Sequence, residues 1–426
     1  MSVTSARVRP SVELRPAAGV AAILVLVASG TAVAFAAVAA PHFSSRIHGL
    51  PGWTGGALGG ASLGLTAAQL YVLLGAMGIA YLGVLALRPP LHWVVAAVVA
   101  LHAVFLLGPP LFSTDIFSYL SYGRLGALHG LDPYVATPSA RPHDVVYPFV
   151  HWRTTPSAYG PLFTVASYGF AQLSPAAGLV AFKALAALSS LGCAGLIGWI
   201  ARRLGRAPAP AVAAFGLNPL VLTWTVGGAH NDVTMLLLTL AGIALVLGAR
   251  EVAGGAALVA AVAVKASAGL AIPFVVLGAR RRRRTALGVA AGALVVGAIS
   301  FVAFSDHAAG MVQVLSAERS LVSADSVPTD VAFLFGGYDV TTPVRVAFEL
   351  GFVAAVALAL FQAWRRRDVI TPTGWAFLAL VATSTWLLGW YTIWSLPFAA
   401  LSRDRRLLIA TIAVQAYFLV NHMPAL

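Results

Sequence analysis

The sequence predicts an all-α protein that crosses a membrane many times, folded as one domain over residues 1–426. Of its 426 residues, 59% are hydrophobic and 10% are charged, whereas about a quarter of the residues in soluble domains are charged. Apolar runs long enough to cross a bilayer as helices cover most of the chain. Short blocks of arginine separate these runs, as is typical of cytoplasmic loops in polytopic proteins.

We expect about thirteen spans. The first apolar run, 20–40, is longer than the core of a signal peptide and is followed by Pro41, so we interpret it as a retained span. The expected spans lie near 18–40, 64–87, 91–108, 176–200, 211–226, 233–249, 252–264, 266–279, 285–304, 343–363, 373–388, 389–401 and 407–423.

The distribution of charge predicts the orientation. The blocks ARRLGR (201–206), RRRRR (280–284), RRR (365–367) and RDRR (403–406) fall on one side of the expected spans. With a cytoplasmic N-terminus, most of the 27 lysines and arginines lie inside and most of the 14 acids lie outside. The net charge of +13 therefore anchors a multi-pass protein in the plasma membrane and does not predict a nucleic-acid partner.

Two long segments are left on the outer side, at about 109–159 and about 305–342. Long loops in compact domains are usually functional, and the first is the expected catalytic loop. The apolar stretch 160–174 follows it, between Pro161 and Pro175. Counting this stretch as a span would move ARRLGR outside, so we expect an interfacial or re-entrant helix here.

Asp115 is the candidate catalytic residue. In a helix that begins near residue 114, Asp115, Ser118, Tyr119 and Tyr122 share one face. A carboxylate at the membrane edge can deprotonate a hydroxyl group within hydrogen-bond reach. The alternative is structural, because an acid in the first turn of a helix is stabilised by the helix dipole.

The first outer loop ends in HWRTTPSAYGP (151–161), which combines Arg153 with Trp152 and Tyr159. An arginine can make bidentate contacts to phosphate. The aromatic side chains either stack on sugar rings or anchor the loop at the membrane interface.

A third group, His230, Asn231 and Asp232, interrupts apolar runs at the outer end of a span. Polar groups at membrane depth are costly and usually functional. No second carboxylate lies at ligand spacing, so we predict no metal site. Lys265, in VAVKASAGL, either extends its amine to the lipid headgroups or holds a lipid phosphate.

The stretch GWYTIWSLP (389–397) places Trp390 and Tyr391 near the outer face. These residues form either an aromatic belt at the interface or the lining of a lipid or sugar groove.

Four motifs together resemble a known family. TDIFSYLSYGRL with GLDPY, WRTTPSAYGPLF, NPLVLTWTVGGAHND and KASAGLAIPF are similar to the polyprenol-phosphate-mannose-dependent α-1,6-mannosyltransferases of mycobacteria and corynebacteria. These enzymes belong to the GT-C glycosyltransferases and elongate the mannan core of lipomannan. The resemblance covers about residues 110–275 and extends more weakly to GWYTIWSLP.

The resemblance implies an inverting transfer without a cofactor, with Asp115 as the base. Many GT-C enzymes have two adjacent acids here, whereas Thr114 precedes Asp115 in this chain, which favours a single base without metal. The implied partners are a polyprenyl-phosphate sugar, a glycan or lipoglycan acceptor and membrane lipids. Lys265, Arg153 and His230 would bind the donor phosphate. Sugar and acceptor would contact Tyr119, Tyr122, Tyr159, Trp152, Asn231, Asp232, Trp390 and Tyr391.

Two alternatives remain. A transporter or flippase for lipid-linked sugars would share the spans and basic loops, but transporters usually show inverted repeats and broken helices at the midplane. No internal repeat is visible in this sequence, and its polar residues gather at one face. The second alternative is a related enzyme using another polyprenyl-phosphate sugar, such as arabinose, and only the motif resemblance favours mannose over it.

Overall fold

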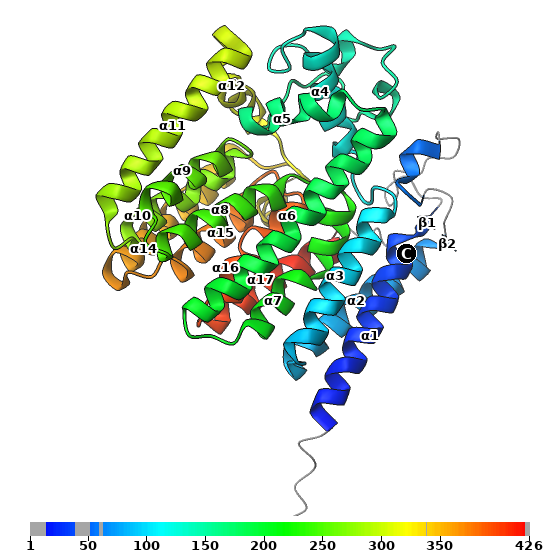
Figure 1. Cartoon of the computed structure of the whole chain (residues 1–426), viewed down its shortest axis with the longest axis vertical. Helices are drawn as coiled ribbons and strands as arrows, with labels where there is room; N and C mark the ends of the chain where they lie inside the picture. The colour runs from blue at the N-terminus through cyan, green and yellow to red at the C-terminus, as the bar shows by residue number, and fades with distance from the viewer. Residues whose placement is uncertain (1–13, 39–51, 59–62, 338, 422–426) are drawn as a thin grey trace, which may run out of the picture.

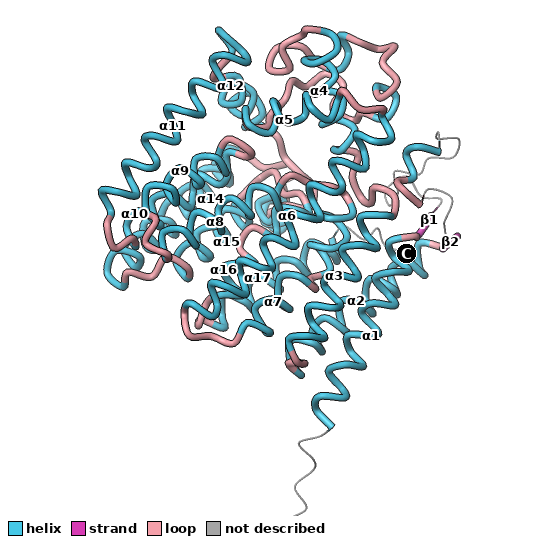
Figure 2. Tube along the Cα trace, viewed as in Figure 1, coloured by secondary structure: helices cyan, strands magenta, loops and turns pink. Residues whose placement is uncertain are grey.

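The computed structural model describes residues 14–38, 52–58, 63–337 and 339–421. Nearly all regular structure is helical, as Figures 1 and 2 show, which confirms the predicted class. One short parallel pair of strands, β1 (Ala36–Val38) and β2 (Leu63–Leu65), is the exception among the described residues.

The first helices are α1 (Leu14–Ala34), α2 (Ala67–Leu87) and α3 (Leu91–Leu107), and α1 packs against the other two. A capping box at Thr66 and Gln69 starts α2. The helix ends at Arg88, in the left-handed region with φ 53°, immediately before two prolines.

The segment predicted as the first outer loop, at about 109–159, has helical structure of its own. It contains α4 (Asp115–His129), η2 (Pro138–Ala140) and η3 (Tyr147–Phe149), and α5 (Pro161–Ala171) follows it. The short η1 (Gly52–Gly55) lies earlier in the chain, before α2. The predicted interfacial or re-entrant segment is therefore the short helix α5, with a proline at its first position.

The remaining elements form the bundle and the second outer loop. The elements before that loop are α6 (Pro175–Arg203), α7 (Pro208–Gly216), η4 (Val221–Gly227), α8 (Asp232–Leu247), α9 (Glu251–Val262), η5 (Ala266–Leu270), α10 (Ala271–Gly278) and α11 (Arg282–Phe304). The loop and the C-terminal part contain η6 (Ser305–His307), α12 (Gly310–Ala317), η7 (Glu318–Ser320), α13 (Val327–Leu334), α14 (Thr342–Arg366), α15 (Thr371–Thr383), η8 (Gly389–Ile393), α16 (Leu396–Leu401) and α17 (Arg405–Asn421).

Five described helices are long and apolar enough to cross a membrane, namely α1, α2, α6, α11 and α14. The pair α7 and η4, bent by 58°, raises the number to six if it forms one span. The polytopic class is therefore supported, whereas the count of thirteen stays a prediction. Several expected spans are short helices here: at 1.5 Å per residue, the 12-residue α9 is about 18 Å long, less than the roughly 30 Å hydrocarbon core.

The long helices differ in how much protein surrounds them. Over their most apolar windows, 56% of α6 residues but only 6% of α14 residues are buried. The exposed side chains of α14 are largely apolar and include Leu350 and Val353. Such a surface is stable against lipid tails and unfavourable in water, which supports the membrane assignment.

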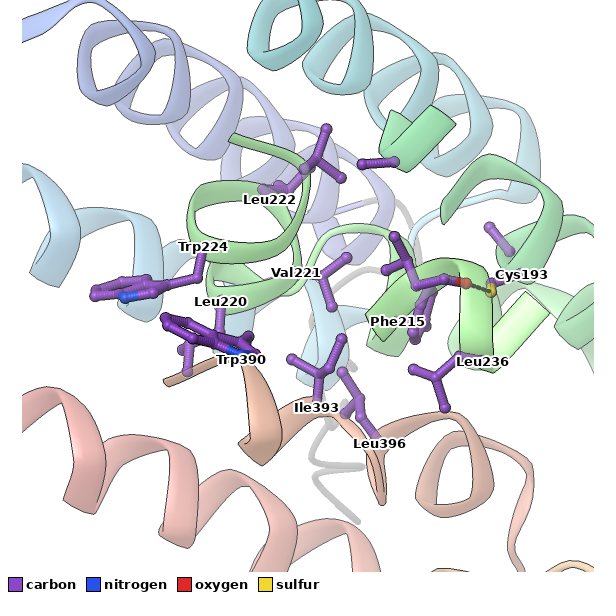
Figure 3. Packing of buried hydrophobic residues seen from close by; sticks show 14 of the residues in the cluster. Cys193, Phe215, Leu220, Val221, Leu222, Trp224, Leu236, Trp390, Ile393 and Leu396 are labelled. Atoms are coloured by element: carbon purple, nitrogen blue, oxygen red, sulfur yellow. Dashed lines mark hydrogen bonds between the residues drawn. The ribbon is translucent and has the colours of Figure 1, made fainter. Parts of the chain in front are cut away.

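The break between α7 and η4 positions part of the site. Asn218 Oδ1 accepts bonds from the backbone N–H groups of residues 220 and 221, and its amide donates to Gln415 of α17. The following turn, η4, is π-helical, a local geometry that is frequent at functional sites. Figure 3 shows Trp224 of η4 and Trp390 of η8 within one buried apolar cluster.

A buried lysine joins the two segments that lead into the site. Lys183 of α6 is 0% exposed, and its Nζ donates to the carbonyl of Pro109 at 3.1 Å and to that of Gly227 at 3.0 Å. Pro109 lies shortly before α4, and Gly227 closes η4. Lys183 therefore fixes the approach to α4 relative to the turn before α8.

Figure 1 places α4, α5 and α12 together at one end of the molecule, whereas the turn between α6 and α7 lies at the opposite end. The basic block 201–206 covers the end of α6 and the start of that turn. The two features that the charge pattern assigned to opposite sides are thus separated along the long axis.

Candidate active site

The helix predicted near residue 114 begins at Asp115, as α4. The hydroxyl oxygen of Ser113 accepts a bond from the backbone N–H of Asp115 at 3.1 Å. The predicted face of Asp115, Ser118, Tyr119 and Tyr122 is buried, with Asp115 itself 8% exposed. The acid therefore faces the interior of the protein at the helix start.

Two neighbours hold the carboxylate of Asp115. Its Oδ1 accepts a 3.2 Å hydrogen bond from Nε1 of Trp152, and its Oδ2 lies 3.6 Å from Nδ1 of His230. Burial raises the pKa of Asp115 to about 6, although Lys265 and the Trp152 bond oppose the shift. A base with a pKa near the working pH is suited to general base catalysis.

His230 lies behind this acid. Its ring stacks on Trp390 with 3.7 Å between centroids, and its Nδ1 is 3.4 Å from the hydroxyl of Tyr119. Burial, with Lys265 as the second cause, holds the pKa of His230 well below its usual range. The imidazole is therefore neutral at pH 7 and carries no charge for a phosphate.

Asp232 and Lys265 form an ion pair. The Nζ of Lys265 is 2.9 Å from each carboxylate oxygen of Asp232, and Trp394 donates to the same carboxylate at 2.6 Å. Lys265 Nζ also lies 4.7 Å from the ring centroid of Tyr391. A fully buried acid and an aromatic ring therefore fix the position of the lysine amine.

Asp115 and Lys265 line the same pocket. Its lining is rich in aromatic side chains and draws on the first outer loop, the turn at η5, the second outer loop and the segment around η8. The lining residues are Asp115, Tyr122, Trp152, Thr155, Pro156, Ala158, Tyr159, Lys265, Ala266, Ser267, Leu315, Glu318, Leu321, Trp386, Leu388, Trp390, Tyr391 and Trp394.

Backbone hydrogen bonds link α5 to the turn that carries Lys265. The N–H of Gly160 donates to the carbonyl of Val264 at 3.0 Å, and the N–H of Leu162 donates to that of Ala263 at 2.9 Å. A Cβ atom placed on Gly160 would lie 2.1 Å from the Ala263 oxygen, so this approach requires glycine.

Most of the predicted site residues converge here. Tyr119, His230 and Asp232 contact lining residues from behind. Asn231 is buried, and its side-chain amide finds no partner among the described residues. Arg153 lies elsewhere: its guanidinium donates to the carbonyls of Val150 and Pro148, so it stabilises its own turn and does not line the pocket.

Sequence reasoning missed three residues. Glu318 and Trp386 line the pocket but lie outside the four motifs. Lys183 carried a usable signal, because a lysine within a long apolar run is rarely without a role. No group of three or more metal-ligating side chains occurs among the residues that the structure describes.

Known proteins resemble this chain over most of its length. A family model described as "Alpha-(1->6)-mannopyranosyltransferase, N-terminal domain" matches residues 16–281. Alpha-(1->6)-mannopyranosyltransferase A of Mycobacterium tuberculosis is 33% identical over 401 residues, covering 86% of this chain and 77% of the relative. The protein of the same name in Corynebacterium glutamicum is 28% identical over 330 residues, covering 67% and 66% respectively.

No solved structure matches the chain. The matched range 16–281 contains Asp115, His230, Asp232 and Lys265, so the acid and the ion pair both lie within the family region. The extent of the family match and the identity to the Mycobacterium tuberculosis relative define what kind of enzyme this membrane protein is. The chain belongs to the alpha-(1->6)-mannopyranosyltransferase family, and it is a mannosyltransferase.

Proposed function

We propose that the protein transfers mannose from a polyprenyl-phosphate donor to a mannan or lipoglycan acceptor, forming an α-1,6 bond on the outer side of the plasma membrane. The observation that carries this proposal is the buried Asp115, which shares an aromatic-lined pocket with Lys265. The pocket combines an acid and a cation with aromatic walls, and it belongs to a chain with several long apolar helices. This combination suits a substrate with a sugar head and a lipid tail.

In the proposed reaction, the carboxylate of Asp115 takes the proton of an acceptor hydroxyl. The oxygen of that hydroxyl forms a bond to the anomeric carbon of mannose, while the bond from this carbon to the phosphate oxygen breaks. Polyprenyl phosphate leaves with the electron pair, and the anomeric configuration inverts. General base catalysis of this kind typically contributes 10²–10⁴-fold to the rate.

Lys265 is the proposed partner of the leaving phosphate. It is the cation that lines the pocket, and Asp232 fixes its amine in place before substrate arrives. Charge that is positioned in advance stabilises a developing anion without reorganisation. The neutral His230 instead orients Asp115, so we reassign it from phosphate binding to positioning.

Asp115→Asn tests the base. In membranes supplied with polyprenyl-phosphate-[¹⁴C]mannose and a mannoside acceptor, we expect transfer to fall by about 10²–10⁴-fold. Asp306→Asn, which removes an exposed acid in the second outer loop, is the control and should transfer at the wild-type rate. Normal turnover by Asp115→Asn would exclude the mechanism. Transfer of arabinose but not mannose by the wild type would exclude the donor.

Orientation has an independent test. The natural Cys193 is buried, so it should react little with a labelling reagent. Arg141→Cys, in the first outer loop, should react with a membrane-impermeant maleimide on intact cells, whereas Arg203→Cys should react only after lysis. The reverse pattern would place the site on the cytoplasmic side.

A further inference from the structure

A second carboxylate lines the pocket, and the proposed mechanism does not use it. Glu318 begins η7 in the second outer loop, beyond the matched range 16–281. Its side chain shares the pocket lining with Asp115 and Lys265, together with Leu315 and Leu321 from the same loop.

Glu318 has no cationic partner. Among the described residues, no lysine, arginine or histidine nitrogen lies within salt-bridge distance of its carboxylate. The adjacent Arg319 pairs instead with Glu349 at 3.7 Å on the outer surface, where both side chains are mostly exposed. Burial raises the pKa of Glu318. A half-buried and uncompensated charge is unfavourable unless something in the pocket hydrogen-bonds to it.

The carboxylate of Glu318 favours a ligand that donates hydrogen bonds and carries no negative charge. An ionised carboxylate only accepts hydrogen bonds, and its two oxygens can receive neighbouring hydroxyl groups of a sugar. It repels phosphate, whereas Lys265 attracts it. The pocket therefore offers a cation from the η5 turn to the donor and an acid from the η7 turn to a neutral polyol.

Trp386 lies on the same wall as Glu318. Backbone and side-chain bonds hold the two segments together: the N–H of Ser323 donates to the carbonyl of Thr385 at 2.8 Å, and the hydroxyl of Ser323 accepts from the N–H of Leu387 at 3.1 Å. The Trp386 ring lies 6.1 Å from that of Trp152, which hydrogen-bonds to Asp115. A sugar stacked on Trp386 would thus lie beside the proposed base.

We propose that Glu318 and Trp386 form the acceptor subsite, in which Glu318 accepts hydrogen bonds from the hydroxyls of a neutral terminal sugar and disfavours anionic acceptors. This inference rests on the proposed function, which takes Asp115 as the base and Lys265 as the partner of the donor phosphate. It makes Glu318 a specificity-determining residue.

The test compares Glu318→Gln with wild type, as full chains in membranes, on three acceptors. The first is an alkyl dimannoside, and the other two carry either a carbamoylmethyl or a carboxymethyl ether on its terminal sugar. We expect the KM for the dimannoside to rise about tenfold, with kcat and the KM for the donor nearly unchanged, since one charged hydrogen-bond acceptor is lost. The preference for the neutral ether over the anionic ether should fall at least fivefold.

Glu349→Gln is the matched control, because it neutralises an exposed acid outside the pocket. It should keep both the KM and the preference between ethers. Equal losses on both ethers, an unchanged KM, or a change confined to the donor would each overturn the assignment. None of these results would affect the Asp115 test, so the two proposals fail separately.

Discussion

The amine of Lys265 lies 2.9 Å from both carboxylate oxygens of Asp232. Asp232 is fully buried, and its carboxylate also accepts a bond from Trp394. Both oxygens of this acid lie against the lysine amine, so the arrangement favours a positioning role for Asp232. The sequence predicts contact with the sugar or acceptor, and that role stays a prediction.

Asp232→Asn should destabilise the protein and weaken donor use. Removing one partner of a buried ion pair typically costs about 3–5 kcal/mol, because the other charge stays buried. We expect a lower midpoint of thermal unfolding in detergent and a higher KM for the donor. The double variant Asp232→Asn/Lys265→Met should recover part of the stability but none of the activity. A double variant less stable than the single one would argue against the coupling.

Asp115→Asn should raise stability while it slows transfer. The folded-state pKa of about 6 exceeds the ordinary value of 3.8, so the folded protein binds the proton more tightly than the unfolded chain. Keeping the carboxylate ionised therefore lowers the free energy of unfolding. This loss grows as pH rises from about 4 to about 6, reaches about 3 kcal/mol and persists at higher pH. At pH 7.5, the variant should unfold at a higher temperature than wild type. A lower unfolding temperature would contradict the shifted pKa.

The rate should depend on pH through the same group. A base with a pKa of about 6 is protonated and inactive at lower pH, so kcat/KM should rise with pH and level off above about 7. The measurement is initial-rate transfer at low acceptor concentration between pH 4.5 and 8. A pH–rate profile with its midpoint near pH 4 would mean that burial does not raise the pKa of Asp115.

Lys183→Met should destabilise the protein without touching the pocket lining. The substitution removes the Lys183 donor from the carbonyl of Pro109, and it leaves the carbonyl of Gly227 with the N–H of Leu111 as its remaining donor. A buried polar group left without a partner costs about 1–3 kcal/mol. Thermal unfolding checks this expectation. Leu188→Met, on the exposed side of the same helix, should unfold at the wild-type temperature. Equal effects of the two substitutions would remove the role assigned to Lys183.

Gly160→Ala should disrupt the site from its backbone. The added Cβ would lie 2.1 Å from the Ala263 oxygen, so α5 and the segment before Lys265 would have to separate. We expect lower stability and at least a tenfold loss of kcat/KM. Gly169→Ala, within the same helix α5, meets nothing within 4 Å and should be tolerated. Wild-type behaviour of Gly160→Ala would show that the close approach is not required.

The helices were predictable where the pattern is local. The expected spans 64–87, 91–108 and 176–200 correspond closely to α2, α3 and α6, because continuous apolar runs bounded by prolines determine their own limits. The expected span 389–401 instead consists of the short η8 and the six-residue α16. Packing against neighbouring helices decides such cases, and it leaves no periodic signal in the sequence.

The site was predictable in membership but not in arrangement. The motifs brought Asp115, His230 and Lys265 to attention, and the structure gathers all three. The ion pair of Asp232 with Lys265 depends on the packing of α8 against α9, which returns the chain to the same end of the molecule. Arg153 lies outside the pocket lining, because its guanidinium donates to backbone carbonyls of its own turn. Sequence alone does not separate that use of an arginine from phosphate binding.

The hydrogen bonds at Gly160 and at Ser323 join the segments that line the pocket into two separate pieces. Those at Gly160 link α5 to the turn that carries Lys265, and those at Ser323 link the loop that carries Glu318 to the segment that carries Trp386. In the proposed reaction a lipid product must be exchanged for fresh donor, and this exchange is easiest when the two linked pieces move apart as intact bodies. Turnover would then be limited by how readily the two halves separate, with the internal bonding of each half preserved.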